Sequence, residues 1–346
     1  EPSFYDENPC HVQEVVRDIF ENWRNRSAEG RYNALLTTHV GGGRASTPMA
    51  MMYFREFRRV NEIRYAKGKP TLKVAVTFSQ NTSNNSTMLE TNKGLYEAIK
   101  AYNQEFGTNW GMDDVSGYTQ DVMSRLNKTA DDGNFLDLVI VVDQLLTGFD
   151  APELNTLYVD RTLKGAGLIQ AYSRTNRIAD MQDKPWGHIV NYRWPAQNEK
   201  LMNRALAIYA NRDSANLTDE ERGKQNALDG ITAPEFEEVF KQVKQKVEKL
   251  DSLTSGFTQV PPSEKQQDFM LDLLREYNAG MAKLKQFKPE EVNGKKVGFD
   301  YADPDELIRA LGMKPEQEVT LTTALANEVK ESPGGAISYV EVPNME

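Results

Sequence analysis

The chain has 346 residues, 39% of them hydrophobic, which is enough material for about two or three domains with ordinary cores. Its formal net charge of −10 argues against a generally basic, non-specific nucleic-acid binder, although a local basic track is compatible with it. The sequence has no apolar run near the roughly 20 residues of a membrane span and no signal-peptide pattern. Cys10 is its single cysteine, so an internal disulfide is impossible. These features predict a cytoplasmic protein.

The first part of the chain alternates predicted helices and strands. Asn8-Pro9, followed by apolar residues at helical spacing up to Trp23, predicts an amphipathic helix with Asn8 as its N-cap. We expect further helices near residues 47–61, 95–106 and 118–128, and from residue 170 onward. Strands are expected at residues 31–40, 73–78, 136–142, 156–160 and 188–192, with a polar surface loop at 79–91. This rhythm predicts an α/β fold with a parallel sheet.

After residue 198 the pattern changes to helical stripes, with no further strand expected before the last few residues. The stripes lie at residues 201–209, 236–250 and 269–284. Two of them follow capping-box patterns, Thr232 with Glu235 and Ser263 with Gln266. We therefore predict an α/β domain at residues 1–198 and a separate all-α domain at residues 199–346. Residues 337–342 fit either an isolated strand or a frayed end.

Two short motifs stand on either side of the strand expected at 156–160. The first, TGFDAP at residues 147–152, follows a continuously apolar run. Open α/β sheets bind ligands beyond the carboxyl ends of their strands, and Gly148 lets the backbone come close to such a ligand. The second motif, QAYSRTNR, is expected to open a helix that places Gln170, Arg174 and Arg177 near one face. Two arginines at that spacing suit the oxygens of a phosphate.

The two motifs resemble motifs V and VI of superfamily-two helicases and translocases, most closely those of the R (motor) subunit of type I restriction-modification enzymes. The resemblance extends more loosely through residues 31–40, 48–60 and 72–79. It implies a RecA-like fold and the second of two motor lobes. Two positions depart from the family pattern: Val142 stands where many relatives have a threonine that touches nucleic acid, and Ser173 replaces the usual glycine of motif VI. The first departure weakens any DNA contact expected at that strand end.

The resemblance also implies roles for individual residues at an ATP site between two lobes. Arg174 and Arg177 match the arginines that neutralise transition-state charge. Asp150 matches the motif V acid near the nucleotide ribose and the domain interface, and Gly148 permits the close turn. Gln170 is a further nucleotide-binding candidate. ATP and Mg²⁺ are the implied cofactors, and both need the missing first lobe with its phosphate loop. Two alternatives stay open: the arginines pair with carboxylates on a solvated helix, and Asp150 is an ordinary turn residue.

Other candidate sites are weaker. GGGRAST at residues 41–47 lacks the spacing and the lysine of a phosphate loop, so a flexible turn is favoured. His11, His39 and His188 lack the paired spacings of a zinc site, and we predict no metal site. Glu328-Val329-Lys330 resembles the end of a PD-(D/E)xK nuclease motif, but its helical surroundings favour coincidence. The basic residues between positions 55 and 69 are expected on a solvated helix face rather than on a DNA track.

We therefore predict the C-terminal part of the ATP-dependent, DNA-translocating and DNA-cleaving R subunit of a type I restriction enzyme. The chain starts at Glu1 rather than at methionine, so we expect an excised piece that is inactive alone. The implied partners are double-stranded DNA and the methyltransferase and specificity subunits. Mixed charges along residues 235–250 suit a protein partner or solvent better than a phosphate track. The open alternatives are another superfamily-two helicase or translocase, and a non-catalytic module whose helical part docks a partner.

Overall fold

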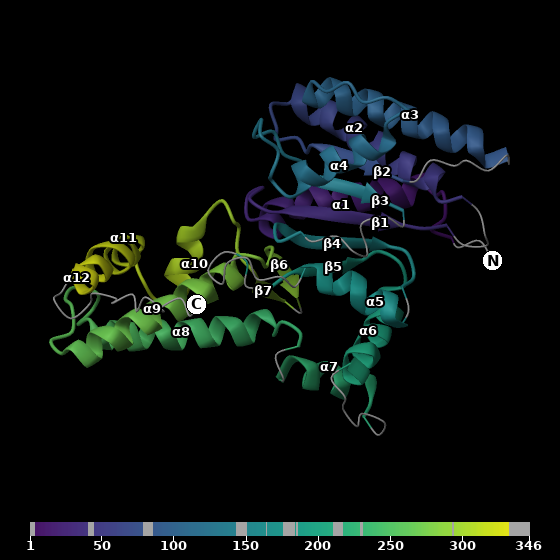
Figure 1. Cartoon of the computed structure of the whole chain (residues 1–346). Helices are drawn as coiled ribbons and strands as arrows, with labels where there is room; N and C mark the ends of the chain where they lie inside the picture. The colour runs from purple at the N-terminus through teal and green to yellow at the C-terminus, as the bar shows by residue number, and fades with distance from the viewer. Residues whose placement is uncertain are drawn as a thin grey trace, which may run out of the picture. The chain divides into compact units, whose positions relative to one another are not determined.

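The computed structural model of the chain forms two compact units, which are described separately (Figure 1). The structure describes residues 4–40, 45–78, 86–142, 151–163, 165–175, 184, 186–209, 217–228, 231–292 and 294–331. Unit 1 comprises the described residues up to 175 and from 186 to 233, and unit 2 consists mainly of those from 234 to 331. The domain boundary expected after residue 198 stays a prediction.

Unit 1 is built on a five-stranded parallel sheet with flanking helices, in the strand order β2-β3-β1-β4-β5 (Figure 1). The strands are β1 (Asn33–Thr38), β2 (Val74–Thr77), β3 (Leu138–Val141), β4 (Leu154–Asp160) and β5 (His188–Asn191). β1, β3 and β4 are buried along their whole lengths, as apolar and β-branched strands covered on both faces should be. The predicted RecA-like α/β fold class is confirmed, and each strand lies where the sequence predicts it.

The helices of unit 1 follow from apolar stripes and local caps. They are α1 (Pro9–Ser27), α2 (Thr47–Ala66), α3 (Ser86–Phe106), α4 (Val115–Leu126), α5 (Gly165–Tyr172), the 3₁₀ turn η1 (Ser173–Thr175), α6 (Pro195–Tyr209) and α7 (Asp219–Leu228). The predicted N-cap of α1 is confirmed, because the Asn8 side chain accepts from the backbone N–H groups of Cys10 and His11 at 3.0 Å and 3.3 Å. Gly107 has a φ of +67° directly after α3, as a left-handed C-cap requires.

The strand order places a topological switch point between β1 and β4. From β1 the chain crosses through α2 to β2, while from β4 it crosses through α5 to β5, so the two crossovers leave in opposite directions. Ligands of open α/β sheets bind at the carboxyl edge beside such a point. The strands β1, β2 and β3 all end at this carboxyl edge, and the residues that follow them at 41–44, 79–85 and 143–150 lie outside the described ranges.

Three sequence-based expectations for unit 1 are wrong in their boundaries. α3 begins at Ser86, within the segment expected to be a loop, and α2 continues five residues past Asn61, to Ala66. The helix expected to open at Gln170 instead ends two residues later, and Arg174 belongs to η1, so the regular helical face expected for these two residues does not form. The hydroxyl of Ser173 donates to the Gln170 carbonyl at 3.0 Å, and such local bonds compete with α-helical ones.

Unit 2 is centred on an antiparallel pair of long helices, with shorter elements after it (Figure 1). The helices are α8 (Phe236–Leu253), α9 (Glu264–Leu284), α10 (Pro304–Ala310), α11 (Pro315–Val319), the π-helix η2 (Thr320–Leu325) and α12 (Ala326–Glu331), and the strands are β6 (Glu290–Val292) and β7 (Lys295–Val297). The long helices touch closely at Gly280: a Cβ added there would lie 2.3 Å from Cγ2 of Val243. One glycine therefore sets how near α8 and α9 approach.

Three details of unit 2 differ from the sequence-based expectation. The antiparallel hairpin of β6 and β7 was not expected in this region. Ser263 caps α9 as predicted, since its Oγ accepts from the Gln266 N–H, but Thr232 does not cap α8, whose N-cap is Glu235 without a side-chain bond. Phe269, expected on the buried stripe of α9, is 50% exposed.

Candidate functional site

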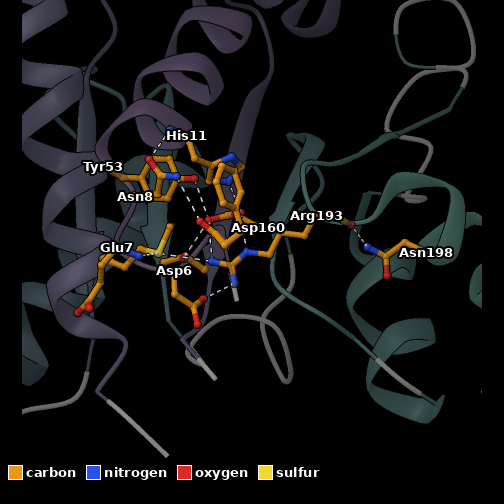
Figure 2. A network of polar contacts seen from close by, with 11 residues as sticks. Asp6, Glu7, Asn8, His11, Tyr53, Asp160, Arg193 and Asn198 are labelled. Atoms are coloured by element: carbon orange, nitrogen blue, oxygen red, sulfur yellow. Dashed lines mark hydrogen bonds and ion pairs between the residues drawn. The ribbon is translucent and has the colours of Figure 1, made fainter. Parts of the chain in front are cut away.

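Asp160, the last residue of β4, is the hub of a buried polar network at the switch point (Figure 2). Arg193 meets this carboxylate twice, with Nε 2.8 Å from Oδ1 and Nη2 3.2 Å from Oδ2. Nε2 of His11 lies 2.8 Å from Oδ1. The hydroxyls of Tyr53 and Thr38 donate to Oδ2 at 2.8 Å and 3.3 Å. One carboxylate thus joins α1, α2, β1 and the turn after β5 to the end of β4.

Arg193 is held between two carboxylates. Its Nη1 lies 2.6 Å from Oδ1 of Asp6, whose side chain is 1% exposed. Burial alone would lower the pKa of Arg193, but hydrogen bonds and charges from Asp160 and Asp6 outweigh burial, and the pKa lies above its ordinary value. Burial and the charge of Asp160 raise the pKa of Tyr53 well above its ordinary value, so this hydroxyl stays a neutral donor. The network is a fixed clamp rather than an acid–base site.

Aromatic rings lock the segment before α1 to the same edge of the sheet. The ring of Tyr5 lies edge-on to the rings of His11 and Trp194, with centroids 4.9 Å and 5.2 Å apart. The Arg193 guanidinium carbon lies 5.8 Å from the Tyr5 centroid. Trp194 has a φ of +47°, a left-handed conformation that bulky residues adopt only where the surrounding packing imposes it. These contacts tie the start of the described chain to the end of β5.

Two of the predicted site residues are described by the structure, and both lie in the crossover between β4 and β5. Gln170 is exposed in the last turn of α5, and Arg174 is half-buried in η1. The hydroxyl of Tyr172 donates to Oδ1 of Asn191 at 2.9 Å, which joins the end of α5 to the last residue of β5. Gly148, Asp150 and Arg177 lie outside the described residues. Their roles stay predictions.

No group of histidine, cysteine, aspartate and glutamate side chains that could hold a metal ion occurs among the described residues. His11 is bound to Asp160, and Nδ1 of His39 lies 3.2 Å from the Ser46 hydroxyl. Glu328 stands in the helix α12, as expected for a chance match to a nuclease motif.

Three arginines of α2 contact acceptors of this same chain. Arg55 lies 2.6 Å from Glu97, and Arg59 lies 2.6 Å from Glu56. Arg64 donates to the Pro70 carbonyl at 2.6 Å. These contacts fit a solvated helix face, and they leave these three guanidiniums poorly placed for a DNA track.

The buried network was not anticipated from the sequence, although a signal for it exists. Asp160 ends a strand that is buried along its length, and Arg193 follows the next strand along the chain. The carboxyl ends of parallel strands meet at one edge, so opposite charges at two such ends can be expected to pair. Asp6 carries no comparable signal, because nothing in its local pattern places it beside β5.

Known proteins resemble the part of the chain that forms the sheet. A family model described as type I restriction enzyme subunit R domain 3 matches residues 30–194. That segment contains all five strands of the sheet, together with Asp160 and Arg193. Residues 30–194 thus resemble domain 3 of type I restriction enzyme R subunits, and they are called the R-subunit segment below. The R-subunit segment therefore includes the carboxyl edge and most of the clamp, while Asp6 and His11 precede it.

Named relatives of this R-subunit segment are endonuclease subunits of type I restriction enzymes. The chain is 32% identical to one from Staphylococcus aureus strain MRSA252 over 203 residues, which is 58% of this chain and 20% of that protein. It is 32% identical over 225 residues to one from Staphylococcus saprophyticus, covering 64% of this chain and 23% of that protein. A protein of Mycoplasma pneumoniae, described as the N-terminal part of a putative type I endonuclease subunit, is 35% identical over 144 residues, or 41% of this chain and 35% of that protein.

The chain spans about a fifth of the length of the staphylococcal relatives. Within the described ranges, no helix combines the length and the apolar character that crossing a membrane would require.

Proposed function

We propose that this chain supplies one half of an ATP site in the DNA-translocating R subunit of a type I restriction enzyme. The observation that carries the proposal is that Arg174 lies in the crossover between β4 and β5 of a RecA-like sheet, within the residues that the R-subunit family model matches. Nucleotide sites of α/β folds lie at the carboxyl edge of the sheet, and an arginine brought to that edge would suit phosphate oxygens. The other half of the site comes from a first motor lobe elsewhere in the full-length protein.

Within this site the residues of the chain bind and orient the nucleotide. Arg174 and Arg177 face the transferring phosphate and neutralise its developing charge, Asp150 lies near the ribose, and Gly148 permits the close backbone turn. Gln170 contributes a polar side chain next to the arginines. Mg²⁺, when bound, would supply positive charge that stabilises the phosphate oxygens. In this proposal the protein ligands of that ion belong to the first lobe.

The partners follow from the same proposal. The full-length subunit moves double-stranded DNA and assembles with methyltransferase and specificity subunits, and unit 2 anchors it to that assembly. A specific feature favours a docking role for unit 2: a shallow groove of about 480 Å³ runs along α8 and α9 and includes the exposed ring of Phe269. Lys249 and Glu248 at its rim are of opposite sign, which suits a protein surface better than a nucleic-acid backbone.

The proposal is tested by ATP hydrolysis in the full-length subunit that contains this chain, with duplex DNA and Mg²⁺. Arg174→Ala should lower kcat by roughly 10³-fold or more, since arginines in this role contribute that much in other nucleotide hydrolases. Arg55→Ala, which removes an exposed ion pair with Glu97, is the matched control and should keep the wild-type rate. A wild-type rate in Arg174→Ala would show that this arginine has no role in hydrolysis and is an ordinary surface residue.

The isolated chain provides a second measurement. Half of the proposed site is missing from it, so DNA-stimulated turnover should stay below about 1 s⁻¹, the low end of ordinary enzyme rates. Faster turnover by the isolated chain would contradict a site divided between two lobes.

A further inference from the structure

Three aromatic rings, those of Phe4, Tyr5 and Trp194, form one continuous surface at the carboxyl edge, the aromatic patch. The ring of Tyr5 lies edge-on to both of its neighbours, with its centroid 5.9 Å from that of Phe4 and 5.2 Å from that of Trp194. Phe4 is 78% exposed and Trp194 is 49% exposed. Single exposed apolar side chains are common on soluble proteins, whereas contiguous exposed rings are typical of a contact surface.

The backbone under the aromatic patch is held in place. Arg193, which precedes Trp194, is clamped between two buried carboxylates. Nδ2 of Asn198 donates to the Arg193 carbonyl (Figure 2), and the Asn198 N–H donates to the Trp194 carbonyl at 2.9 Å. A side chain on such a support loses little conformational entropy when a partner binds to it.

The backbone conformation of Trp194 is one that a bulky residue disfavours. Its φ of +47° lies in the left-handed region, where the Cβ atom crowds the backbone and where glycine and asparagine are the usual residues. Strained conformations of this kind persist where the surroundings impose them, and they cluster at functional sites. A ring that stays half exposed recovers only part of this cost within unit 1, which indicates that it gains further contacts elsewhere.

The chemistry of the aromatic patch favours a protein surface over nucleic acid. Binding to DNA depends mainly on lysine and arginine contacts with phosphates. The guanidinium that contacts the Tyr5 ring is that of Arg193, which is 5% exposed and already pairs with two carboxylates, so its charge is not free for a phosphate. Tryptophan and tyrosine are enriched at the centre of protein–protein contacts, where they contribute much of the affinity.

We propose that the aromatic patch is the surface by which this chain contacts the first motor lobe when nucleotide is bound. The patch lies at the edge where the proposed ATP site is shared between two lobes. The matched family model is described as domain 3, and the chain spans about a fifth of its staphylococcal relatives, so such proteins contain further domains that can meet this edge. The occupant is an apolar surface of the first lobe, which packs on Trp194 and Phe4. This inference rests on the proposed ATP site and adds residues outside both motifs.

The test is hydroxyl-radical footprinting of the full-length subunit, with oxidation of each aromatic residue read by mass spectrometry. A non-hydrolysable ATP analogue with Mg²⁺ should lower the oxidation rate of Trp194 by about 3-fold or more, because the core of a protein contact excludes water. Tyr65, which is 81% exposed near the end of α2, is the internal control and should keep its rate. A Trp194 rate that the analogue leaves unchanged would overturn the proposal. Protection that appears only with duplex DNA or with the methyltransferase core would also overturn it.

Two variants of the full-length subunit give a second readout, the affinity for the same ATP analogue. Trp194→Asn removes the ring and keeps a residue that tolerates left-handed backbone, and Phe4→Ser removes a largely exposed ring. Nucleotide that binds between two lobes favours their closed arrangement, so each variant should weaken binding of the analogue by roughly 5-fold to 30-fold, as important interface side chains do. Tyr65→Ser is the matched control and should bind the analogue as wild type does.

The outcomes separate this inference from the proposed function. Wild-type affinity in a folded Trp194→Asn would show that the patch is not a lobe contact; if that variant does not fold, Phe4→Ser decides. If Arg174→Ala is inactive while the analogue leaves Trp194 oxidation unchanged, the ATP site stands and the contact is wrong. If Trp194 is protected while Arg174→Ala hydrolyses ATP at the wild-type rate, the contact stands and the role of Arg174 is wrong.

Discussion

Asp160 and Arg193 form a two-pronged ion pair inside unit 1, with contacts of 2.8 Å and 3.2 Å between the carboxylate and the guanidinium. The carboxylate side chain is 0% exposed and the arginine side chain 5% exposed. Water cannot compensate either charge at this depth, so each depends on the other and on the groups around them. Asp160 ends β4 and Arg193 follows the end of β5, so their pairing holds together the edge at which the proposed nucleotide site lies.

Asp160→Asn should strongly destabilise unit 1. The change keeps the size of the side chain but leaves Arg193 with Asp6 as its remaining carboxylate, and breaking a buried pair typically costs about 3 to 5 kcal/mol. Urea unfolding of the isolated chain, followed by circular dichroism, measures the loss. Glu97→Gln breaks the exposed pair with Arg55 and should leave the unfolding curve nearly unchanged. Equal stability of Asp160→Asn and wild type would mean that the ion pair contributes nothing net.

Gly280→Ala should destabilise unit 2 by about 1 to 3 kcal/mol, because the new methyl group would overlap Val243 and push α8 away from α9. Val243→Ala makes room for this methyl group. In the Val243→Ala background, Gly280→Ala should therefore lower the free energy of unfolding much less than it does in wild type. Gly167→Ala is the control: nothing lies within 4 Å of its added Cβ, and replacing a helical glycine there should stabilise by about 0.5 to 1 kcal/mol. Thermal unfolding of wild type, the two single variants and the double variant gives the coupling energy between positions 243 and 280. Strictly additive effects would show that the two side chains do not touch.

Glu318→Gln should stabilise the chain at neutral pH. Burial raises the pKa of Glu318 above its ordinary value of 4.5, although Lys285 and the Tyr277 hydroxyl favour the charged form. The folded chain therefore holds this proton more tightly than the unfolded chain. Stability is present in full below the unfolded pKa and is lost as pH rises through the folded pKa. Glutamine keeps the acceptor for Tyr277 without the charge, so the variant should melt higher than wild type near about pH 7 and equally near about pH 4.

A pH-independent difference between Glu318→Gln and wild type would place the effect in packing rather than in protonation. Glu316→Gln is a suitable comparison, because Glu316 is an exposed acid in the same helix, α11. Its melting temperature should follow that of wild type at both pH values.

Phe269→Ser should weaken the assembly of the full-length subunit with the methyltransferase core more than it weakens ATP binding. The ring is half exposed and borders the groove along α8 and α9, so its loss should leave the fold of unit 2 intact. Val319→Ser is the matched control, an exposed apolar residue of unit 2 outside that groove. Co-purification or calorimetry with the core measures the effect. Unchanged affinity for the methyltransferase core after deletion of residues 234–346 would show that unit 2 does not anchor the subunit. Unit 2 would then act on the motor lobe or on DNA.

The sequence predicted the strands well because their apolar, β-branched runs are long and uninterrupted. The run at residues 136–142 corresponds to β3, and the cap at Asn8 holds because its geometry depends on two nearby N–H groups. The end of α5 was missed because Ser173 and Thr175 bond back to the chain there, and helical periodicity does not register such hydroxyl contacts.

The clamp at the carboxyl edge was missed for a different reason. Asp6 and Arg193 are 187 positions apart, and no local pattern expresses a contact of that range. The hairpin β6–β7 was missed because its strands have three residues each, too few for an alternating pattern to stand out.

Cys10 is a site for fluorescent labelling at the carboxyl edge of the sheet. It is the sole cysteine of the chain, it is exposed, and it stands in the first turn of α1 next to His11, which touches Asp160. A thiol-reactive, environment-sensitive dye would therefore attach at a single position without any mutagenesis. Its emission would report on whatever approaches the carboxyl edge, nucleotide or neighbouring lobe, in the same sample used for the unfolding measurements.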